Sequence, residues 1–184
     1  MIMIDRESRR SWKFDPNYTT VEFAIRNLWY NVRGRFGVVQ GAIVLDEEDI
    51  SRSSVTATIR ADTIDTKNKK RDAHLLLEDF LDVEKFPEIE FKSTSVRRGR
   101  DRDSLDVDGT LTVKDKTVPI ALAVNEMDRS RSPSGEEFVY YSATTTLDRL
   151  AFGITYGRGI IGRSLKVTIN VQASSNRTKE LKKL

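Results

Sequence analysis

The stretch LDVDGTLTV, Leu105–Val113, places apolar side chains at its first, third, seventh and ninth positions and polar side chains at every even position. Successive side chains of a β-strand point to opposite faces. The stretch therefore has one apolar and one polar face, which is the pattern of an antiparallel sheet that packs on a core and meets water on its other side. It indicates an all-β fold.

Four further stretches alternate in the same way. They are TVEFAIR (20–26), SSVTATIRA (53–61), EIEFKS (88–93) and LKVTINV (165–171). Polar turn segments separate the strands, and the whole pattern predicts about eight to ten of them. A sheet of that size tends to curl, to split into two layers or to close into a barrel, and closure removes its edges. Composition alone does not choose between a sandwich and a barrel.

The stretch GRFGVVQGAIVL is less regular than the others. Phe36 and Val38 have one parity, whereas Ile43 and Leu45 have the other. A bulge or bend within 37–41 reconciles the two halves, as expected where a sheet curls.

One stretch breaks the alternation and predicts a short amphipathic helix over about 68–81. Its apolar side chains recur at the spacing i, i+3, i+4, i+7 and i+8, and they are Ala73, Leu76, Leu77, Phe80 and Leu81. Pro87 ends any continuation of the helix, and an alternating strand follows at once. We expect the apolar face of this helix to lie on the sheet or to cap an opening in the barrel, with Leu76, Leu77 and Phe80 turned inward.

The composition is that of one soluble domain, 1–184, with a sizeable core. The 31 basic and 28 acidic residues give a net charge of +3 that is spread along the chain. This small excess argues against nucleic-acid binding. The basic end NRTKELKKL is expected to fray.

No cysteine is present, which excludes disulfides, thiol nucleophiles and thiolate metal sites. The opening residues MIMIDRESRRSW carry charges where a secretion signal needs an apolar stretch. No run approaches the roughly 20 apolar residues that span a bilayer. We therefore expect a cytoplasmic protein without stable membrane insertion, or a periplasmic one if the sequence is a trimmed mature form.

His74 is the only histidine, and Glu78 lies four residues on, where the two can pair along one flank of the helix. A base with its orienting acid still needs a nucleophile, and no serine stands in a Gly-x-Ser-x-Gly elbow. One histidine among scattered carboxylates is also a poor metal set. The residues favour a structural role first, a polar contact at a ligand pocket second and catalysis last. We predict neither a catalytic nor a metal site.

The glycine-rich stretch GITYGRGIIG, 153–162, lacks the lysine and the following helix of a phosphate loop, so we interpret it as a flexible loop at the rim of a barrel. The chain also holds more aromatic bulk than a small core needs. These side chains either fill the core or surround one ligand, since an eight-stranded barrel is wide enough for either. A helix that closes such a barrel leaves a dry, concave site.

Five stretches match a known pattern in order: FDPNYTTVEFAIRNL, VRGRFGVVQGAIVLDEED, SSVTATIRADTIDTKNKKRDAHLLLEDFLDVEKFPEIEFKSTSV, VDGTLTVKDKTVPIALAV and SATTTLDRLAFG. They resemble the YceI-like family over a core of 12–173, which leaves terminal extensions at 1–11 and 174–184. The resemblance implies a lipocalin-like antiparallel barrel of about eight strands. It also implies a pore occupied by a polyisoprenoid or an isoprenoid quinone, in binding or carrier proteins that do not catalyse a reaction.

Several positions depart from the family pattern. Tyr18 and Asn27 stand where members commonly have histidines, and Tyr156 is nearest to the place of a common tryptophan. The turn LTVKDK lacks the usual glycine. Because two polar groups that could meet a head group are changed, the resemblance does not carry over the identity of the ligand. Many members are exported, and the resemblance is compatible with a homodimer.

We predict that apolar and aromatic side chains line the pore and its helical lid, and that two polar side chains near the helix contact the ligand. The apolar set is Phe23, Ile25, Leu28, Phe36, Ile43, Ile59, Phe80, Phe86, Phe91, Leu111, Phe152 and Tyr156, and the polar pair is Arg71 and His74. No cofactor is expected other than a bound polyisoprenoid or quinone-like lipid. Two alternatives stay open: a stress-response or protein-interaction module whose barrel is filled by its own side chains, and a hydrolase or isomerase that uses His74.

Overall fold

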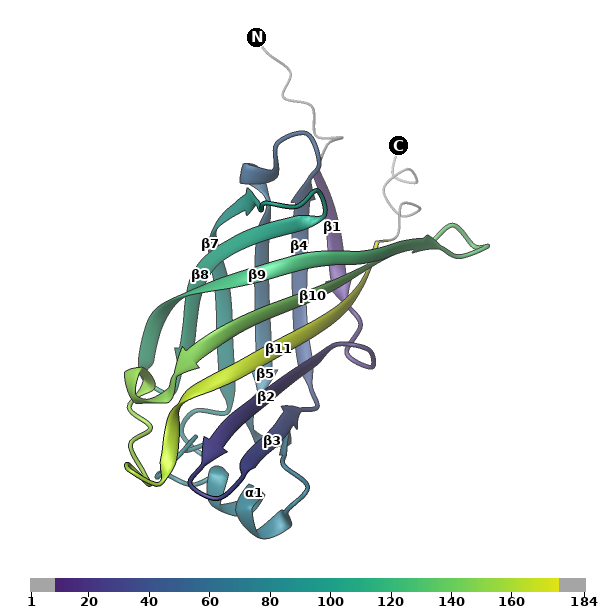
Figure 1. Cartoon of the computed structure of the whole chain (residues 1–184). Helices are drawn as coiled ribbons and strands as arrows, with labels where there is room; N and C mark the ends of the chain where they lie inside the picture. The colour runs from purple at the N-terminus through teal and green to yellow at the C-terminus, as the bar shows by residue number, and fades with distance from the viewer. Residues whose placement is uncertain (1–8, 176–184) are drawn as a thin grey trace.

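Eight antiparallel strands close into a barrel in the computed structural model, which describes residues 9–175 (Figure 1). In order around the barrel they are β1 (Arg9–Phe14), β4 (Val39–Asp46), β5 (Ser54–Arg60), β7 (Glu88–Arg98), β8 (Ser104–Val113), β9 (Lys116–Arg131), β10 (Glu137–Asp148) and β11 (Ile161–Ser175). β11 pairs with β1 and so closes the ring. The predicted all-β barrel is confirmed.

Part of each terminal extension predicted from the sequence, 1–11 and 174–184, belongs to the barrel. Residues 9–11 belong to β1, and residues 174–175 belong to β11. The rest of both extensions, with the basic end expected to fray, lies outside the described residues.

The alternation of β8 places its apolar side chains inside the barrel. Val107, Leu111 and Val113 are buried, and the polar residues between them are exposed or half-exposed. Gly109 takes an inward position beside Phe91, where an added Cβ would come within 2.6 Å of the aromatic ring. A glycine at this position therefore lets the Phe91 ring occupy the interior.

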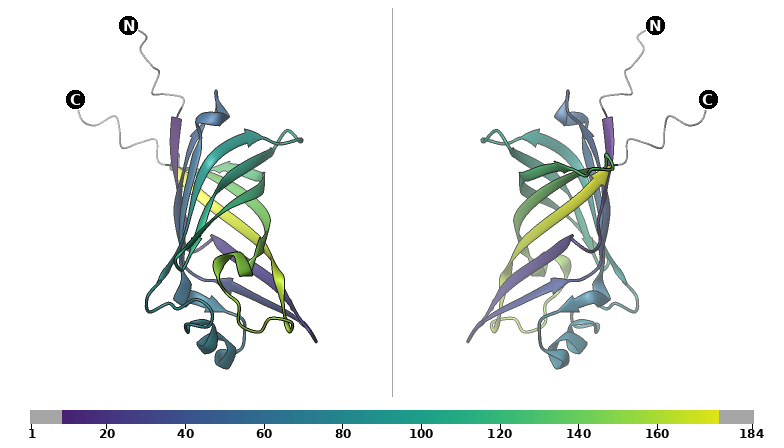
Figure 2. Two further views of the ribbon diagram at one scale, coloured as in Figure 1. Left: turned by 90° about the vertical axis from the view of Figure 1, so that its left-hand side faces the viewer. Right: turned by 90° about the vertical axis from the view of Figure 1, so that its right-hand side faces the viewer.

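Three further strands extend the sheet at one end of the barrel. β2 (Thr20–Asn27) continues along β11 where β1 stops, β3 (Asn31–Phe36) pairs with β2, and β6 (Ile64–Asp65) pairs with β3. Figure 2 shows the β2–β3 hairpin spreading away from the barrel wall. The β2–β3 turn, α1 (Lys69–Leu75) and the loop 153–160 lie together at this end, which we call the α1 end.

The chain bends between β3 and β4, where the inward parity changes. Gly37 and Val38 belong to no strand, and their backbone N–H groups donate to Thr63 Oγ1 at 3.1 and 3.2 Å. Phe36 is buried before the bend and Val39 after it. The predicted bend is confirmed, but it separates two strands where the sequence pattern indicated one curved strand.

α1 is shorter than predicted. It begins after Asn68, whose side-chain oxygen accepts from the backbone N–H of Arg71 at 3.0 Å, and it ends at Leu75. The chain then folds back, so that the backbone N–H of Leu81 donates to the Leu75 carbonyl at 3.1 Å. Asp82 takes a left-handed backbone conformation at this reversal, with φ of 49°.

The reversal decides which side chains of this segment face the barrel. Leu81 is buried and reaches the interior, whereas Leu76 and Phe80 are only half-buried. Ala73 and Leu77 are exposed. The predicted inward orientation of Leu77 is therefore wrong, because the helix ends before a continuous apolar stripe can form.

Three short 3-10 helices connect strands. They are η1 (Ile50–Arg52), η2 (Ala61–Thr63) and η3 (Arg149–Phe152). η3 ends at Gly153, whose φ of 74° lets its N–H turn back to the carbonyls of the preceding turn. This left-handed position suits glycine because it has no Cβ, and it directs the chain into the loop 153–160.

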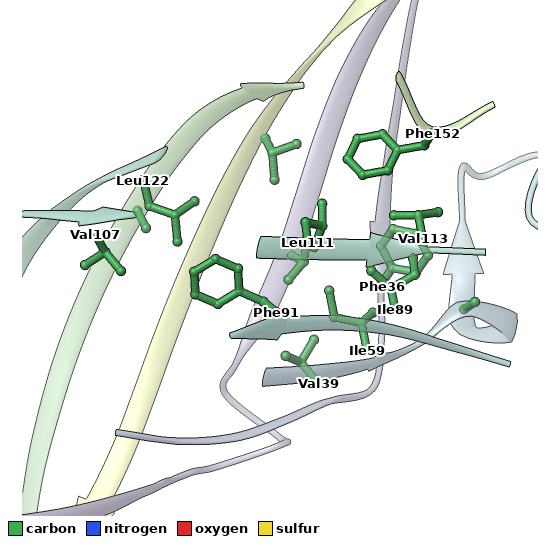
Figure 3. Packing of buried hydrophobic residues seen from close by; sticks show 14 of the residues in the cluster. Phe36, Val39, Ile59, Ile89, Phe91, Val107, Leu111, Val113, Leu122 and Phe152 are labelled. Carbon is green, nitrogen blue, oxygen red and sulfur yellow. The ribbon is translucent and has the colours of Figure 1, made fainter. Parts of the chain in front are cut away.

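The interior holds two packed groups of side chains. The larger one includes Phe91, Leu111 and Leu122, which project from neighbouring strands into the barrel (Figure 3). The smaller one surrounds Trp12 on β1 at the place where the barrel closes, and its other buried members are Ile43, Leu45, Val139, Tyr141 and Ala173. Trp12 thus packs together the strands on both sides of the closure.

Replacement of Trp12 by alanine tests this role. Trp12 is 1% exposed, so we expect Trp12→Ala to lower the free energy of unfolding by about 3–5 kcal/mol. The matched control is Trp29→Ala, since Trp29 is 81% exposed and its loss should change stability by less than about 0.5 kcal/mol. Urea unfolding followed by circular dichroism measures both. Equal effects of the two substitutions would contradict the packing described here.

Candidate functional site

The barrel encloses an apolar cavity of about 220 Å³. Inward side chains of the barrel strands form its wall together with those of β2 and β3. Among the residues that line it, only Tyr141, Thr145 and Arg149 carry a side-chain oxygen or nitrogen. A space with so few polar partners holds water poorly and accepts apolar molecules.

Small residues at inward positions keep this space open. Ala57 on β5 and Ala143 on β10 line the cavity among larger apolar neighbours. The interior of an eight-stranded barrel is just wide enough for ordinary side chains to fill it. Alanines at such positions therefore leave room that a ligand can take.

Tyr141 marks the end of the cavity that lies away from α1. Its side chain lines the apolar cavity, and its hydroxyl donates to Glu126 Oε2 at 3.1 Å in an adjoining polar pocket. Arg129 pairs with Glu126 and, at 2.6 Å, with Glu47 Oε1. Burial, and then the nearby Glu126, raise the pKa of the Tyr141 hydroxyl, so it stays a hydrogen-bond donor at neutral pH. A charged network therefore bounds the apolar space at this end.

Arg149 is the buried charge at the other end of the cavity, with 4% of the residue exposed. Its guanidinium donates to four backbone carbonyls: Nε to Gly162 at 2.8 Å, Nη1 to Ile154 and Tyr156 at 2.8 Å each, and Nη2 to Ile161 at 3.0 Å. These carbonyls belong to the loop 153–160 and the start of β11. Arg149 therefore fastens this loop to the barrel.

The burial of Arg149 has an electrostatic consequence. Desolvation lowers the pKa of its guanidinium, the positive Arg158 lowers it further, and Asp148 raises it. An arginine stays protonated through such shifts because its ordinary pKa is so high. The charge is thus stabilised by carbonyl dipoles, and its donors point at the backbone of the loop.

His74 lies in a small aromatic cluster at the α1 end, outside the residues that line the cavity. Its ring meets Phe80 and Tyr156 edge-on, with centroids 5.1 and 4.9 Å away, and its Nε2 lies 3.0 Å from Asp79 Oδ2. The predicted pairing with Glu78 is therefore wrong, because the helix ends before that residue and the turn presents Asp79 instead. The cluster joins α1 to the loop 153–160.

Arg71 is also engaged within the protein. Its Nε donates to Thr66 Oγ1 at 2.8 Å and its Nη2 to the Thr66 carbonyl at 2.9 Å. Asp72 accepts the backbone N–H of the same threonine at 3.0 Å. These contacts fasten the start of α1 to Thr66, the residue after β6, and the structure thus places Arg71 in a supporting role outside the cavity.

Seven of the candidate ligand-binding side chains line the cavity: Phe23, Phe36, Ile43, Ile59, Phe91, Leu111 and Phe152. Five apolar candidates do not, namely Ile25, Leu28, Phe80, Phe86 and Tyr156. None of the five lines the cavity because Ile25 and Leu28 belong to the end of β2 and the turn after it, Phe80 and Phe86 to the segment after α1, and Tyr156 to the loop 153–160. Leu28 lies in the β2–β3 turn and is 57% exposed, and Tyr156 is 47% exposed.

Arg149 is one of the site residues that were not predicted from the sequence, together with Ala57, Tyr141 and Ala143. A lone arginine after a strand looks like any surface arginine, because the burial that distinguishes it comes from a loop folded over it. The available signal was its place in the run LDRLAFG, directly after an alternating strand.

Within residues 9–175, no helix is long and apolar enough to cross a bilayer.

Comparisons with known proteins agree on one family and one fold. The YceI-like domain family matches residues 12–173. Protein YceI of Salmonella arizonae and that of Salmonella paratyphi B are each 31% identical to this chain over 170 residues, which cover 92% of this chain and 84% of the relative.

Three solved structures share the fold. BcnA of Burkholderia cenocepacia superposes with a TM-score of 0.77 at 16% identity, covering 86% of this chain and 98% of its own. The Campylobacter jejuni YCEI protein gives 0.70 at 23% identity, covering 80% and 86%. A polyisoprenoid binding domain from Saccharophagus degradans, implicated in plant cell wall breakdown, gives 0.68 at 12% identity, covering 91% and 99%.

Replacement of Arg149 by methionine tests its hold on the loop. Four carbonyl partners lose their donor, so we expect the free energy of unfolding to fall by about 3 kcal/mol and amide exchange in 154–162 to accelerate. Arg163→Met is the control, because Arg163 is an exposed arginine paired with Asp148 and surface pairs contribute about 0–1 kcal/mol. Unchanged amide exchange in the Arg149→Met protein would contradict this role.

Proposed function

Because this chain belongs to the YceI-like family, we propose that it is a non-catalytic binding and carrier protein that holds a long apolar molecule, a polyisoprenoid or an isoprenoid quinone, in the barrel cavity. The observation that carries the proposal is the apolar cavity enclosed by the strands. The related fold of the Saccharophagus degradans polyisoprenoid binding domain supports the class of ligand.

The walls of the cavity suit a hydrocarbon chain. Burial of apolar surface contributes about 25 cal/mol per Å² without any polar recognition. The inward donors and acceptors are few, and the guanidinium donors of Arg149 are turned to backbone carbonyls. A charged group in the middle of the cavity would therefore be poorly solvated. A prenyl chain has no polar group that needs a hydrogen-bond partner there.

The size of the cavity constrains the ligand. Its volume of about 220 Å³ exceeds the roughly 150 Å³ of a cavity that admits benzene. It is smaller than the roughly 300–1,000 Å³ of pockets for drug-sized ligands. A chain of many prenyl units therefore requires lining side chains to move apart. We expect Phe23 and Phe36 near the α1 end, whose ring centroids are 5.9 Å apart, to be the pair that moves.

The two alternatives meet specific observations. A barrel filled by its own side chains would leave no continuous cavity, whereas this one encloses a space. A hydrolase or isomerase centred on His74 would work at the outer face of the α1 end, since His74 contacts Phe80, Tyr156 and Asp79 outside the cavity lining. An activity that disappears in a His74→Ala protein would favour that alternative. Dimerisation and a cytoplasmic location stay predictions from the sequence.

Organic extraction of natively purified protein, followed by mass spectrometry, tests the proposal. We expect a co-purified prenyl lipid, or saturable binding of prenyl probes of graded length to protein stripped of lipid. The absence of both a bound lipid and saturable probe binding would contradict the proposed function.

A cavity-filling variant locates the ligand. Ala143 lines the cavity, and Ala123 is an exposed residue of the adjacent β9. We expect Ala143→Phe to weaken prenyl-probe binding by at least about tenfold, because the ring occupies the space of the ligand. Ala123→Phe adds the same ring outside the barrel and should leave binding unchanged. Fluorescence titration measures both, with circular dichroism to confirm folding, and equal affinities would place the ligand elsewhere.

A further inference from the structure

Exposed large apolar side chains gather at the α1 end of the barrel. Six of them lie on its three segments: Leu28, Trp29 and Tyr30 in the β2–β3 turn, Leu77 after α1, and Tyr156 and Ile160 in the loop 153–160. Trp29 is 81% exposed. A tryptophan so open to water, among five other apolar side chains, marks a surface that another phase or molecule covers.

These segments form one surface. The backbone N–H of Leu28 donates to the Ile160 carbonyl at 3.0 Å, which joins the β2–β3 turn to the loop. The rings of Tyr156 and His74 lie 4.9 Å apart, which joins the loop to α1. Figures 1 and 2 show the three segments at the same end of the barrel in every view.

The β2–β3 hairpin and the loop 153–160 carry charge of one sign at this surface, whereas the turn after α1 carries the carboxylates of Glu78 and Asp79. Residues 26–35 contain three arginines and residues 153–163 contain two, and neither stretch contains a carboxylate. Arg163 pairs with Asp148 and Arg35 with Asp65. Arg26, Arg33 and Arg158 form no ion pair with any residue of 9–175. The parts of the apolar surface formed by the β2–β3 turn and the loop 153–160 are thus bordered by arginines that form no ion pair within the described fold.

We propose that the α1 end docks on the surface of a bilayer that contains anionic lipids, with Trp29, Tyr30 and Ile160 in the interfacial layer. Tryptophan and tyrosine favour the boundary between head groups and acyl chains because their rings are apolar with one polar edge. Arginines beside them meet the lipid phosphates. This docking goes beyond the proposed function, since it depends on the outer surface and not on the occupant of the cavity.

The charge pattern favours a lipid surface over a second copy of the chain. A two-fold interface brings the same patch of both subunits together, and here it would bring Arg26, Arg33 and Arg158 toward their own counterparts. The two segments that carry these arginines contain no carboxylate, so like charges oppose such a contact. An anionic bilayer instead supplies an apolar layer for the aromatic side chains and a negative layer for the arginines.

Docking in this orientation places the cavity beside the lipid. Phe152 and Ile154 line the cavity and lead directly into the loop 153–160. The buried Arg149 holds that loop against the barrel. The segment in contact with the membrane is therefore the same one that bounds the α1 end of the apolar space.

Vesicle co-sedimentation tests the proposal, with vesicles of phosphatidylcholine alone and of phosphatidylcholine mixed with phosphatidylglycerol. We expect the protein to bind the mixed vesicles, to bind less at high salt and to bind phosphatidylcholine alone weakly. The only two tryptophans report separately, since Trp12 is buried and Trp29 is exposed. Binding should shift the emission of Trp29 to the blue, and brominated lipids should quench it.

Four variants distinguish binding through the α1 end from binding through any exposed arginine or aromatic side chain. Trp29→Ala should weaken vesicle binding about tenfold, and Arg158→Gln about fivefold. Tyr18→Ala removes another exposed aromatic side chain, which lies in the β1–β2 loop and is 64% exposed. Arg100→Gln removes an exposed arginine in the β7–β8 turn, at the opposite end of the barrel from α1. These two controls should bind like the unmodified protein.

Three results would overturn the proposal. The first is that the protein does not bind mixed vesicles, and the second is that all four variants bind as tightly as the unmodified protein. The third is a dimer that Trp29→Ala abolishes, in a protein that does not bind vesicles. The last result would show that this surface is an interface between copies. No prenyl probe enters the assay, so its failure is distinguishable from failure of the proposed function, which lipid extraction and probe titration measure.

Discussion

The structure depends on a short pairing that turns a sheet into a tube. Lys13 and Phe14 of β1 lie opposite Ser174 and Ala173 of β11, and β1 pairs with β4 on its other side. Without this contact, β1 and β11 would be open edges that invite pairing with other chains. Closure also converts the apolar faces of the strands into an interior. Trp12 packs beside this junction, so a bulky core residue stabilises the place where the pairing of β1 with β11 is short.

Closure and alternation together produce a site without a polar motif. Each strand contributes every second side chain to the interior, and alanines at 57 and 143 leave part of that interior unfilled. The two ends of the cavity differ in how they are bounded. A charged network beyond Tyr141 bounds one end, and the other depends on a loop that Arg149 holds by its backbone carbonyls.

Much of the barrel could be predicted from the sequence because its determinants are local. The alternation in 105–113 fixes which side chains point inward, and the parity change within 34–45 locates the bend at Gly37 and Val38. Seven of the pore residues follow from the same rule, including Phe91 and Leu111. These positions lie in the middle of strands, where the period of two is not interrupted.

The predictions were wrong where distant segments meet. The spacing of apolar residues favoured a helix to Leu81, but the chain reverses after Leu75 so that Leu81 can reach the interior. Leu28 follows the apolar pattern of β2 yet lies in an exposed turn. The burial of Arg149 and the partner of His74 depend on the loop 153–160 and on the turn after α1, which no local pattern specifies.

The central claim is that the closed barrel holds a long apolar molecule in its cavity. A crystal structure of natively purified protein, never exposed to organic solvent, measures this most directly. We expect continuous, chain-like electron density in the space between Ala57 and Ala143, in contact with Phe91 and Leu111. An interior in which the side chains have closed over the space, with no density other than protein, would contradict the claim.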